Sequence, residues 1–453
     1  MKIIKSYKFR LYPTEEQAAM LLQHGGNSRF VWNKLLEFSN NIKKETNKYP
    51  NQSQLQKQII QIKALNPFLK LSHSQPIQIN ALRLSNTISK SFKPEIIKER
   101  NAKIAKANTI KDEKIRSQSL KNAFEFALPK FKSKNRNNDS IFYPQNFIIK
   151  KTRIYLPKLK WINYIKHREI EGKPLFTTIT KDGNQFYVSI SCEVEIEEKP
   201  SIPLDQANIV GIDVGLKNFA TLSDGTIIEN PRTLKYNLRK IKRESKNLKR
   251  KQLKETEKRT FDNKIIKKSS NNRDKQIIKV QKIHRKIRNI RNNFLHNITH
   301  HIIAKYDGII LENLDIKGML KKNSKAMNRS ISDVSWYEFG RILEYKSKWN
   351  SKYFTKIDQY FASTQICNNC GNQMKLSLKD RIYSCQNCEA VSDRDINASK
   401  NIRDGGINKL KQDTVATTGI KVCGQTAIAG WTKQKKRKFQ QSKDCCLTKS
   451  PSL

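Results

Sequence analysis

The chain has 453 residues, of which 89 are Lys or Arg and 40 are Asp or Glu, so its formal net charge is +49. A compact body with this charge repels itself and is stabilised by a polyanion, which argues against a solitary small-molecule enzyme. No apolar run approaches the roughly 18 residues that cross a bilayer, and the opening MKIIKSYKFRLYP leaves no room for a signal peptide. We therefore expect a cytoplasmic, nucleoid-associated protein that binds nucleic acid and no membrane.

The N-terminal region is predicted to contain a strand followed by helices. Apolar and polar residues alternate as far as Leu11, as in a strand with one buried face. Thr14 and Gln17 have the spacing of a capping box, so a helix should begin there. Gly25-Gly26 should break that helix, which predicts a helical hairpin, and polar helices continue to about residue 126.

A strand pattern then replaces the helical one. The clearest hairpin covers 176–194, with its turn at Asp182-Gly183-Asn184. Cys192 lies in the alternating pattern of this hairpin and is expected to be a small core residue. The charged, proline-containing stretch 195–206 predicts a linker to a second domain, whose order of strands and helices indicates an α/β fold.

The second domain contains a strongly basic segment. Between residues 235 and 291, 23 Lys or Arg accompany 5 Asp or Glu, a local net charge of +18 over 57 residues. Apolar residues keep helical spacing on both sides of a mixed stretch at 263–272, which predicts two basic amphipathic helices joined by a loop. A solvated lysine face is the ordinary interpretation of such helices, but this charge density favours contact with phosphates.

Four of the eight cysteines have the C-x2-C-x14-C-x2-C spacing of a zinc ribbon. They are Cys367, Cys370, Cys385 and Cys388. Two such knuckles present four thiolates to one tetrahedral Zn²⁺, which supplies folding energy that a short segment lacks. A pair of disulfides or a redox pair is the alternative, which a reducing cytoplasm disfavours. The remaining cysteines of the polar tail, Cys423, Cys445 and Cys446, lack a fourth ligand for a second site.

Three acidic residues stand at the ends or beginnings of expected elements. Asp213 lies in the strand 209–215, whose GIDVG sequence fits the first hairpin of an RNase H-like nuclease and also the opening of an actin-like ATPase. Glu312 ends an apolar strand, where a carboxylate needs solvent or a counter-ion such as a metal. Asp395 follows the ribbon where a helix should begin, so Asp393 and Asp395 are also ordinary capping candidates.

These three acids together suggest a further possibility. Two-metal hydrolysis of a phosphodiester needs several carboxylates that converge on Mg²⁺ ions about 3.5 to 4 Å apart. Asp213, Glu312 and Asp395 meet this requirement only if the fold brings three separate elements together.

The chain resembles the TnpB (OrfB-type) family of transposon-encoded RNA-guided nucleases, which are related to the compact type V CRISPR effectors. The resemblance runs from YKFRLYPTEEQ near the N-terminus to DRDINASKNI after the ribbon. It is carried by the GID, LEN and DRDxNA segments, the RuvC motifs I to III of that family, together with the four-cysteine ribbon. The resemblance implies that Asp213, Glu312 and Asp395 are catalytic and hold two Mg²⁺ ions, beside one structural Zn²⁺. The last motif reads NAS where the family usually has NAA.

The resemblance also implies an α/β multidomain architecture. An RNase H-like RuvC nuclease domain with an inserted zinc ribbon would be preceded by a β-barrel wedge domain that carries a helical recognition lobe. The expected bounds are 1–14 and 127–205 for the wedge barrel, 15–126 for the lobe, 206–365 and 392–410 for the nuclease domain, 366–391 for the ribbon and 411–453 for a basic, disordered tail. Arg29 and Asn33, expected to be exposed in the lobe, are candidates for contacting DNA.

The function implied is an RNA-guided, Mg²⁺-dependent DNA endonuclease. It would bind a guide RNA derived from the transposon end and cut double-stranded target DNA beside a short transposon-associated motif. One alternative is a nuclease-inactive, RNA-guided regulator, which should have lost one of the acids. Another is a transposase or its accessory DNA-binding protein. Single-strand transposases of these elements use a His-hydrophobic-His pair, whereas His300 and His301 are adjacent here.

Overall fold

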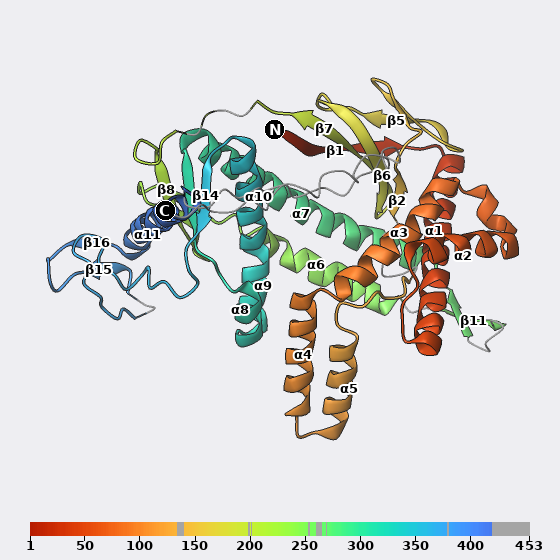
Figure 1. The fold of residues 1–453 in the computed structure, drawn as a ribbon, viewed down its shortest axis with the longest axis horizontal. Helices are drawn as coiled ribbons and strands as arrows, with labels where there is room; N and C mark the ends of the chain where they lie inside the picture. The colour runs from red at the N-terminus through yellow and green to blue at the C-terminus, as the bar shows by residue number, and fades with distance from the viewer. Residues whose placement is uncertain are drawn as a thin grey trace, which may run out of the picture.

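The computed structural model describes residues 1–133, 140–197, 200, 202–251, 254–259, 265–268, 270–377 and 380–418, with side chains omitted for 254–259, 265–268 and 414–418. Within these ranges the buried apolar side chains form three main clusters. One cluster lies on an N-terminal sheet, one among the N-terminal helices and one in a second, C-terminal sheet. Figure 1 shows where these sheets and helices lie. None of the described helices combines the length and the apolar character that crossing a membrane would require.

The N-terminal sheet contains seven strands in the order β2-β6-β7-β1-β5-β4-β3. They are β1 (Lys2–Tyr12), β2 (Ser140–Tyr143), β3 (Ile148–Ile149), β4 (Arg153–Leu156), β5 (Lys160–Ile165), β6 (Lys173–Asp182) and β7 (Gln185–Glu195). The expected β-barrel is present in part, as a half-barrel, because β2 and β3 each pair on one side only among the described strands. Since β3 has two residues, it is too short to complete a ladder with β2, and the sheet remains an open half-barrel.

The hairpin of β6 and β7 confirms the prediction made from the alternating pattern. The two strands pair antiparallel up to Asp182 and Gln185. The side chains of β7 predicted to share one face are all buried: Phe186, Val188, Ile190, Cys192 and Val194. Cys192 is therefore the core residue that its position predicts.

The helical lobe lies between β1 and β2 in the chain. It consists of α1 (Glu15–Thr46), α2 (Gln52–Leu65), the 3₁₀ helix η1 (Pro67–Leu71), α3 (Ser74–Ser91), α4 (Pro94–Asn108) and α5 (Glu113–Phe124). α1, α2 and α3 share one apolar core. α4 and α5 form a hairpin that projects away from the rest of the molecule (Figure 1).

The first helix confirms one prediction and contradicts another. Thr14 and Gln17 form the predicted capping box in both directions. The helical hairpin is wrong, because α1 continues through Gly25-Gly26. Glycine costs about 1 kcal/mol relative to alanine inside a helix, but tertiary contacts on the same turns offset that cost. His24 lies 3.2 Å from the Tyr143 hydroxyl, and Asn27 donates to Ser72 at 2.7 Å.

The second sheet has five strands in the order β10-β9-β8-β13-β14. They are β8 (Ile209–Val214), β9 (Asn218–Leu222), β10 (Ile227–Glu229), β13 (Gly308–Leu311) and β14 (Tyr353–Lys356). β8, β9 and β10 form the predicted antiparallel hairpins, whereas β13 runs parallel to β8 and β14. α7 (Asn271–Lys305) and α10 (Trp336–Trp349) cover one face, and α11 (Arg394–Thr418) covers the other. The sheet is therefore a buried middle layer, as its nearly continuous apolar strands predict.

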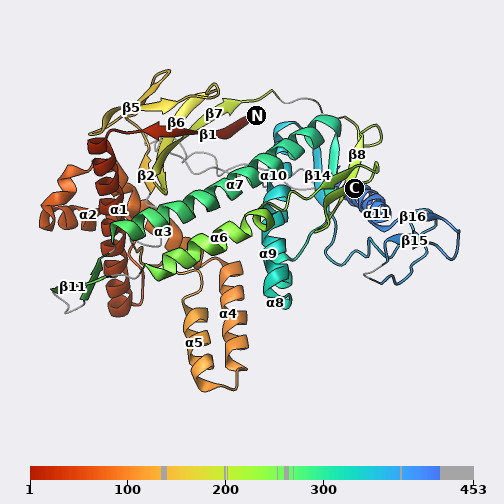
Figure 2. The same cartoon turned by 180° about the vertical axis from the view of Figure 1, so that it is seen from behind.

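The two predicted basic helices are present as α6 (Thr233–Arg250) and α7, which pack against each other. Both run between the second sheet and the helical lobe (Figure 2). The loop predicted at 263–272 is wrong in part, because β12 (Ile265–Lys268) pairs with β11 (Lys254–Arg259) and α7 already begins at Asn271. Backbone pairing gives this polar segment a structure that its side-chain pattern does not reveal.

The remaining elements follow the second sheet along the chain. α8 (Ile316–Lys322) and α9 (Lys325–Val334) precede α10, while β15 (Ile382–Ser384) and β16 (Val391–Asp393) precede α11. The expectation of a disordered tail from residue 411 is wrong for 411–418, which continue α11 as regular helix. Cys423, Cys445, Cys446 and the rest of the tail lie outside the described residues.

Candidate functional site

Asp213 and Glu312 lie next to each other at one edge of the second sheet. β8 and β13 are adjacent parallel strands, and their last pair in register is Ile212 with Leu311. The residue after each member of this pair is an acid, so the two carboxylates leave the sheet side by side. Their convergence therefore follows from the register of the two strands.

Asp395 is brought to the same edge by the close packing of α11 on β8. A Cβ atom at Gly211 would lie 2.1 Å from the carbonyl oxygen of Ser399 and 2.4 Å from the backbone nitrogen of Arg403. The helix backbone thus crosses β8 directly at Gly211. Asp395 is one helical turn before Ser399, toward the end of β8 that carries Asp213.

We expect Gly211→Ala to destabilise the protein by about 3 kcal/mol, the upper end of typical overpacking costs. The reason is that backbone atoms of α11, which cannot swing aside, occupy the space of the new methyl group. The melting temperature would report this loss. Gly26→Ala is the matched control: its Cβ would have one ordinary contact, with Arg29 at 3.7 Å, so it should stabilise α1 slightly. An unchanged melting temperature for Gly211→Ala would contradict the packing described.

The three acids share one electrostatic environment. The pKa of Asp213 is raised well above its usual value, first by burial and then by the negative charges of Glu312 and Asp395. The guanidinium of Arg394 acts in the opposite direction. Burial also raises the pKa of Glu312. These shifts are those of carboxylates crowded together without enough positive charge.

Ser363 holds Glu312 in place. Its hydroxyl donates a hydrogen bond of 2.6 Å to Glu312 Oε1, which partly opposes the effect of burial on the pKa of that carboxyl. Ser363 itself is buried. A short bond to a carboxylate from a fixed donor restricts the rotamer of Glu312.

Asp393 and Asp395 have different surroundings. Asp393 Oδ1 accepts hydrogen bonds from the backbone N–H groups of Asp395 and Ile396, at 2.8 and 3.1 Å, so Asp393 caps α11. Asp395 instead contacts the guanidinium groups of Arg394, at 3.3 Å, and Arg381, at 3.9 Å. The capping interpretation therefore applies to Asp393.

The donor set at this edge fits a divalent cation. Carboxylate oxygens are the ligands that Mg²⁺ prefers, and Asp213 lies close enough to Glu312 and Asp395, on two other elements, to feel their charges. Asp213 is half-buried and has no ion-pair partner within 4 Å among the described residues. A cation of charge +2 would relieve the repulsion that raises the pKa of Asp213.

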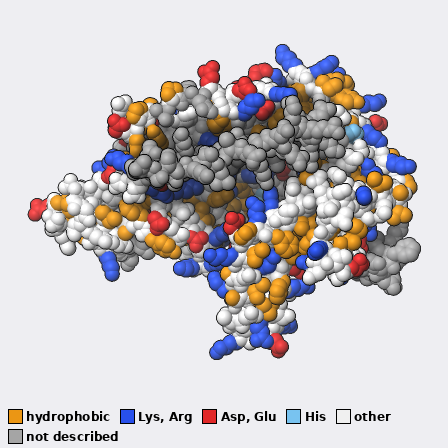
Figure 3. Space-filling view, in the orientation of Figure 1, with side chains coloured by type: hydrophobic (Ala, Val, Ile, Leu, Met, Phe, Trp, Pro, Cys, Tyr) orange, Lys and Arg blue, Asp and Glu red, His pale blue; other side chains and the backbone are white. Residues whose placement is uncertain are grey.

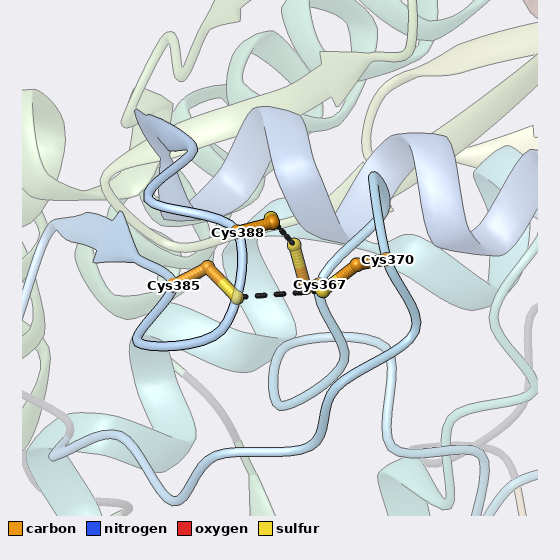
Figure 4. Close-up of side chains that lie close together, drawn as sticks. All are labelled: Cys367, Cys370, Cys385 and Cys388. Atoms are coloured by element: carbon orange, nitrogen blue, oxygen red, sulfur yellow. Dashed lines mark hydrogen bonds between the residues drawn. The ribbon is translucent and has the colours of Figure 1, made fainter.

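The four ribbon cysteines form a second candidate metal centre. Their sulfur atoms lie within 4.8 Å of one another, and the side chains converge between two loops (Figure 4). Cys367 Sγ is 3.7 Å from Cys388 Sγ, and Cys370 Sγ is 3.5 Å from Cys385 Sγ. Disulfide sulfurs would be about 2.05 Å apart. Zn–S bonds of about 2.3 Å place tetrahedral sulfurs roughly 3.8 Å apart, so the cluster fits zinc.

Hydrogen bonds to the sulfurs support this assignment. The pKa of Cys385 is lowered, mainly by a backbone hydrogen bond from Cys388, and the pKa of Cys388 is lowered mainly by the Asn369 side chain. Burial raises the pKa of Cys367. Zinc binds thiolates, and donors aimed at the sulfurs stabilise that form.

Two buried asparagines of α11 tie the ribbon to the helix that carries the third acid. Asn397 Nδ2 donates to the Ile366 carbonyl at 2.7 Å, and its Oδ1 accepts from the Asn368 backbone N–H at 2.9 Å. Asn401 Nδ2 donates to the carbonyls of Ser363, at 2.8 Å, and Ile366, at 2.6 Å. The first knuckle, the Ser363 loop and α11 thus form one hydrogen-bonded unit.

One acid links the two basic helices α6 and α7 to α9. Asp333 of α9 accepts hydrogen bonds from the Leu234 backbone N–H, at 2.9 Å, and from Arg291 Nη2, at 2.6 Å. It therefore holds the start of α6 and the middle of α7 together. Lys and Arg side chains are spread over the visible face of the molecule, with few Asp and Glu among them (Figure 3).

Arg29 and Asn33, the candidate DNA-contacting residues of the lobe, are distant in sequence from Asp213, Glu312 and Asp395. The expectation that they are exposed is wrong, because both are only half exposed. Asn33 exchanges two hydrogen bonds with the backbone of Lys132, at 3.0 and 2.8 Å. These bonds fix the segment that leads back to the half-barrel. A DNA contact by Arg29 or Asn33 stays a prediction.

Sequence patterns assign no role to Ser363, Asn401 or Asp333. The sequence gives one weak indication that Ser363 is functional. It belongs to a Ser-Thr pair just before the ribbon, where members of the TnpB family often have two serines. The partners of Asn401 and Asp333 are 35 or more residues away. No local pattern predicts such contacts.

Comparisons with known families identify three segments of the chain. Residues 189–323 match the OrfB family described as "Probable transposase", and residues 336–402 match "Cas12f1-like, TNB domain". Residues 1–48 match a family described as "Helix-turn-helix domain". In that last segment the structure has the strand β1 and the single helix α1.

Relatives align along most of the chain. It is 30% identical over 424 residues to "Putative RNA-guided DNA endonuclease InsQ" of Escherichia coli K12, covering 90% of this chain and 93% of the relative. A Streptomyces pristinaespiralis protein named "Putative RNA-guided DNA endonuclease" is 28% identical over 418 residues, covering 90% of each chain.

Solved structures include two similar chains. The structure of CasPhi-2 (Cas12j) bound to crRNA has a TM-score of 0.40 at 10% identity, covering 89% of this chain and 98% of that chain. The Cas12f1-sgRNA-target DNA complex has a TM-score of 0.30 at 15% identity, covering 89% of this chain and 100% of that chain.

Proposed function

This chain belongs to the TnpB (OrfB) family, and from that premise we propose that it is an RNA-guided DNA endonuclease with a RuvC-type active site formed by Asp213, Glu312 and Asp395. One observation carries the proposal. Asp213 and Glu312 follow the last paired residues of two adjacent parallel strands, and burial together with the negative charges of Glu312 and Asp395 raises the pKa of Asp213. Carboxylates whose pKa is raised by burial and by neighbouring acids are concentrated at functional sites, and a bound metal would offset their repulsion.

The residues around the acids have complementary roles in this proposal. Asp213, Glu312 and Asp395 would hold two Mg²⁺ ions, Ser363 orients Glu312, and Arg394 limits the repulsion at Asp213. The bound ions would supply a hydroxide nucleophile and stabilise the leaving 3′ oxygen of the cut strand. Cys367, Cys370, Cys385 and Cys388 would hold one structural zinc.

The partners follow from charge and from the relatives. The relatives above are named as putative RNA-guided DNA endonucleases, and α6 and α7 give this chain two basic helices. We assign to the chain a guide RNA from the transposon end and a double-stranded DNA target beside a transposon-associated motif. The helices would contact backbone phosphates, while base pairing selects the sequence. Such a protein acts in the cytoplasm at the nucleoid.

The proposed domains are those expected from the resemblance, with one change. The half-barrel and the inserted lobe remain at 1–14 with 127–205 and at 15–126, and the ribbon at 366–391. The nuclease domain extends through 418, because α11 is continuous to that residue.

The test is to sequence the RNA that copurifies with the protein and to offer DNA that matches it. We expect one RNA with a defined end, and Mg²⁺-dependent cutting of matching DNA but not of scrambled DNA. Random cellular RNA, or cutting regardless of sequence, would contradict guidance. A defined RNA and specific DNA binding without any cutting would instead favour the nuclease-inactive regulator, although all three acids are present.

A further inference from the structure

Two histidines of the helical lobe meet one tyrosine of the half-barrel, and the proposed function gives none of the three a role. His24 of α1 is 1% exposed, and its Nδ1 lies 3.2 Å from the hydroxyl of Tyr143 in β2. His73 directly precedes α3, and its ring stacks on that of Tyr143 with 6.2 Å between the centroids. The three side chains lie where α1, α3 and β2 pack against one another (Figure 1). We call this cluster the His-Tyr joint.

Both histidines fit the joint as neutral rings. His24 Nε2 and His73 Nδ1 are buried and make no well-formed hydrogen bond within the described part of the chain. Protonation makes both nitrogens of an imidazole N–H donors and gives the ring a positive charge. A buried positive charge without a counter-ion is much costlier than a neutral ring in the same place. Burial raises the pKa of Tyr143, so its hydroxyl stays protonated and supplies no negative charge.

The groups that face the joint also oppose a positive charge there. Lys158, in the turn between β4 and β5, and Lys63 of α2 are cations, and no carboxylate is among the groups that shift the pKa of either ring. Burial is the main cause that lowers the pKa of both histidines, and Lys158 lowers both further. The backbone carbonyl of Leu71 opposes this shift at His24 only in part. His73 stands at the positive end of the α3 dipole, which disfavours its protonation as well.

β2 is the element that a charge in the joint would release. It has four residues at the edge of the half-barrel and pairs with β6 alone among the described strands. An edge strand this short depends on its side-chain contacts to stay in place. α1 keeps a separate anchor at the start of β5, because the Gln17 amide donates to the carbonyls of Leu159 and Trp161 at 2.9 Å each. Loss of the joint therefore detaches β2 and leaves α1 in place.

We propose that the His-Tyr joint is a proton-sensitive device, which holds β2 against the helical lobe at neutral pH and lets β2 open in mild acid. This inference goes beyond the proposed function and is independent of it. Its direction follows from the pKa values. Docking lowers the pKa of both histidines below the ordinary 6.5, so the open form takes up protons that the closed form excludes. The closed form is therefore fully stable above pH 6.5 and loses stability as the pH falls below that value.

Hydrogen exchange of the full chain with its copurified RNA tests the joint, measured by mass spectrometry between about pH 5 and pH 8. After correction for the intrinsic pH dependence of exchange, the opening constant of the β2 amides should rise about tenfold per pH unit for each proton taken up, or up to about a hundredfold when both rings respond. β8 contains no histidine and lies inside the second sheet, so its opening constant should show no rise of this size. A flat profile for β2 would overturn the proposal.

His24→Gln and His73→Gln each remove one titrating ring and keep a neutral polar side chain. Each should reduce the rise in β2 opening by about tenfold per pH unit, and the double variant should abolish it. His300→Gln is the matched control, because His300 is exposed on α7 and lies outside the joint. It should keep the full rise. A double variant that behaves as the unmodified protein, or a control variant that loses the rise, would contradict the proposal.

A second measurement needs no substitution, so it decides the proposal even if the variants do not fold. Exchange of the imidazole C2 hydrogens, followed by mass spectrometry, gives a titration midpoint for each histidine. The midpoints of His24 and His73 should lie below 6.5 in the folded protein and return to about 6.5 in denaturant. A midpoint of about 6.5 or higher for either ring in the folded protein would overturn the proposal. Neither measurement involves cutting, so the absence of nuclease activity would contradict the proposed function but not the joint.

Discussion

Asp213→Asn is expected to reduce guided DNA cleavage by more than about a hundredfold while preserving the folded protein. Residues that only orient metal ligands typically contribute about 10- to 100-fold, and a ligand itself should contribute more. Glu312→Gln and Asp395→Asn should have the same effect. Ser363→Ala, which removes only the hydrogen bond to Glu312, should fall within the 10- to 100-fold range. Rates of cutting under single-turnover conditions would measure each loss.

The same change should raise the melting temperature of the metal-free protein at neutral pH. Burial and the charges of Glu312 and Asp395 raise the pKa of Asp213 above its usual value of 3.8. When folding raises the pKa of a carboxyl, the free energy of unfolding falls as the pH rises above the usual pKa of that group. At pH 7, above that usual value, the raised pKa of Asp213 is therefore destabilising, and a neutral amide removes the effect.

Magnesium provides the control that separates metal binding from general stability. Mg²⁺ should raise the melting temperature of the unmodified protein, because it binds only the folded state, and should raise that of Asp213→Asn much less. Asp393→Ala should lose about 1 kcal/mol of stability with the helix cap but keep cleavage. Full activity of Asp395→Asn together with an inactive Asp393→Ala would move the catalytic role to Asp393.

Local patterns predicted those parts of the fold that depend on neighbours in sequence. The capping box at Thr14, the β6-β7 hairpin and the basic helices are all confirmed, because caps, alternation and helical spacing act over a few residues. The break at Gly25-Gly26 is wrong for the opposite reason. Contacts with α3, η1 and β2, which are distant in sequence, determine whether that helix continues.

The candidate site shows the same division. The three acids were identified from their motifs, but their convergence depends on the register of β13 against β8 and on the absence of a side chain at Gly211. Neither the strand register nor the close packing at Gly211 can be predicted from one short segment of the sequence. Buried amide networks such as that of Asn401 are equally hidden, because an asparagine in a helix usually faces solvent.

Removing zinc is expected to abolish cleavage although none of the four ribbon cysteines has a hydrogen bond to the acids in the described part of the chain. Cys370→Ser should bring the zinc content from one per chain to none and make the ribbon sensitive to protease, because a structural zinc supplies about 10 to 16 kcal/mol of folding energy. Asp395 is seven residues after Cys388 and is positioned by the helix that the ribbon contacts, so a loosened ribbon displaces it. Metal analysis, limited proteolysis and cleavage rates would follow the three effects.

Cys192→Ala is the matched control for the cysteine change, because Cys192 is buried in β7 and lies outside the metal cluster. It should retain zinc and cleavage. Binding of the guide RNA should survive in both variants, since α7 packs on the face of the sheet opposite α11 and α6 packs on α7. A zinc-free protein that still cuts at the full rate would contradict any link between the ribbon and Asp395.

Asn401→Ala tests the hydrogen bonds between α11 and the segment before the ribbon separately from zinc binding. This change keeps all four cysteines but removes the hydrogen bonds to the carbonyls of Ser363 and Ile366. We expect one zinc per chain, a ribbon that resists protease, and cleavage reduced by about 10- to 100-fold, the range for groups that orient metal ligands. If Asn401→Ala cuts normally while Cys370→Ser does not, zinc acts by folding the ribbon alone. If both lose activity, the ribbon acts on the acids through α11.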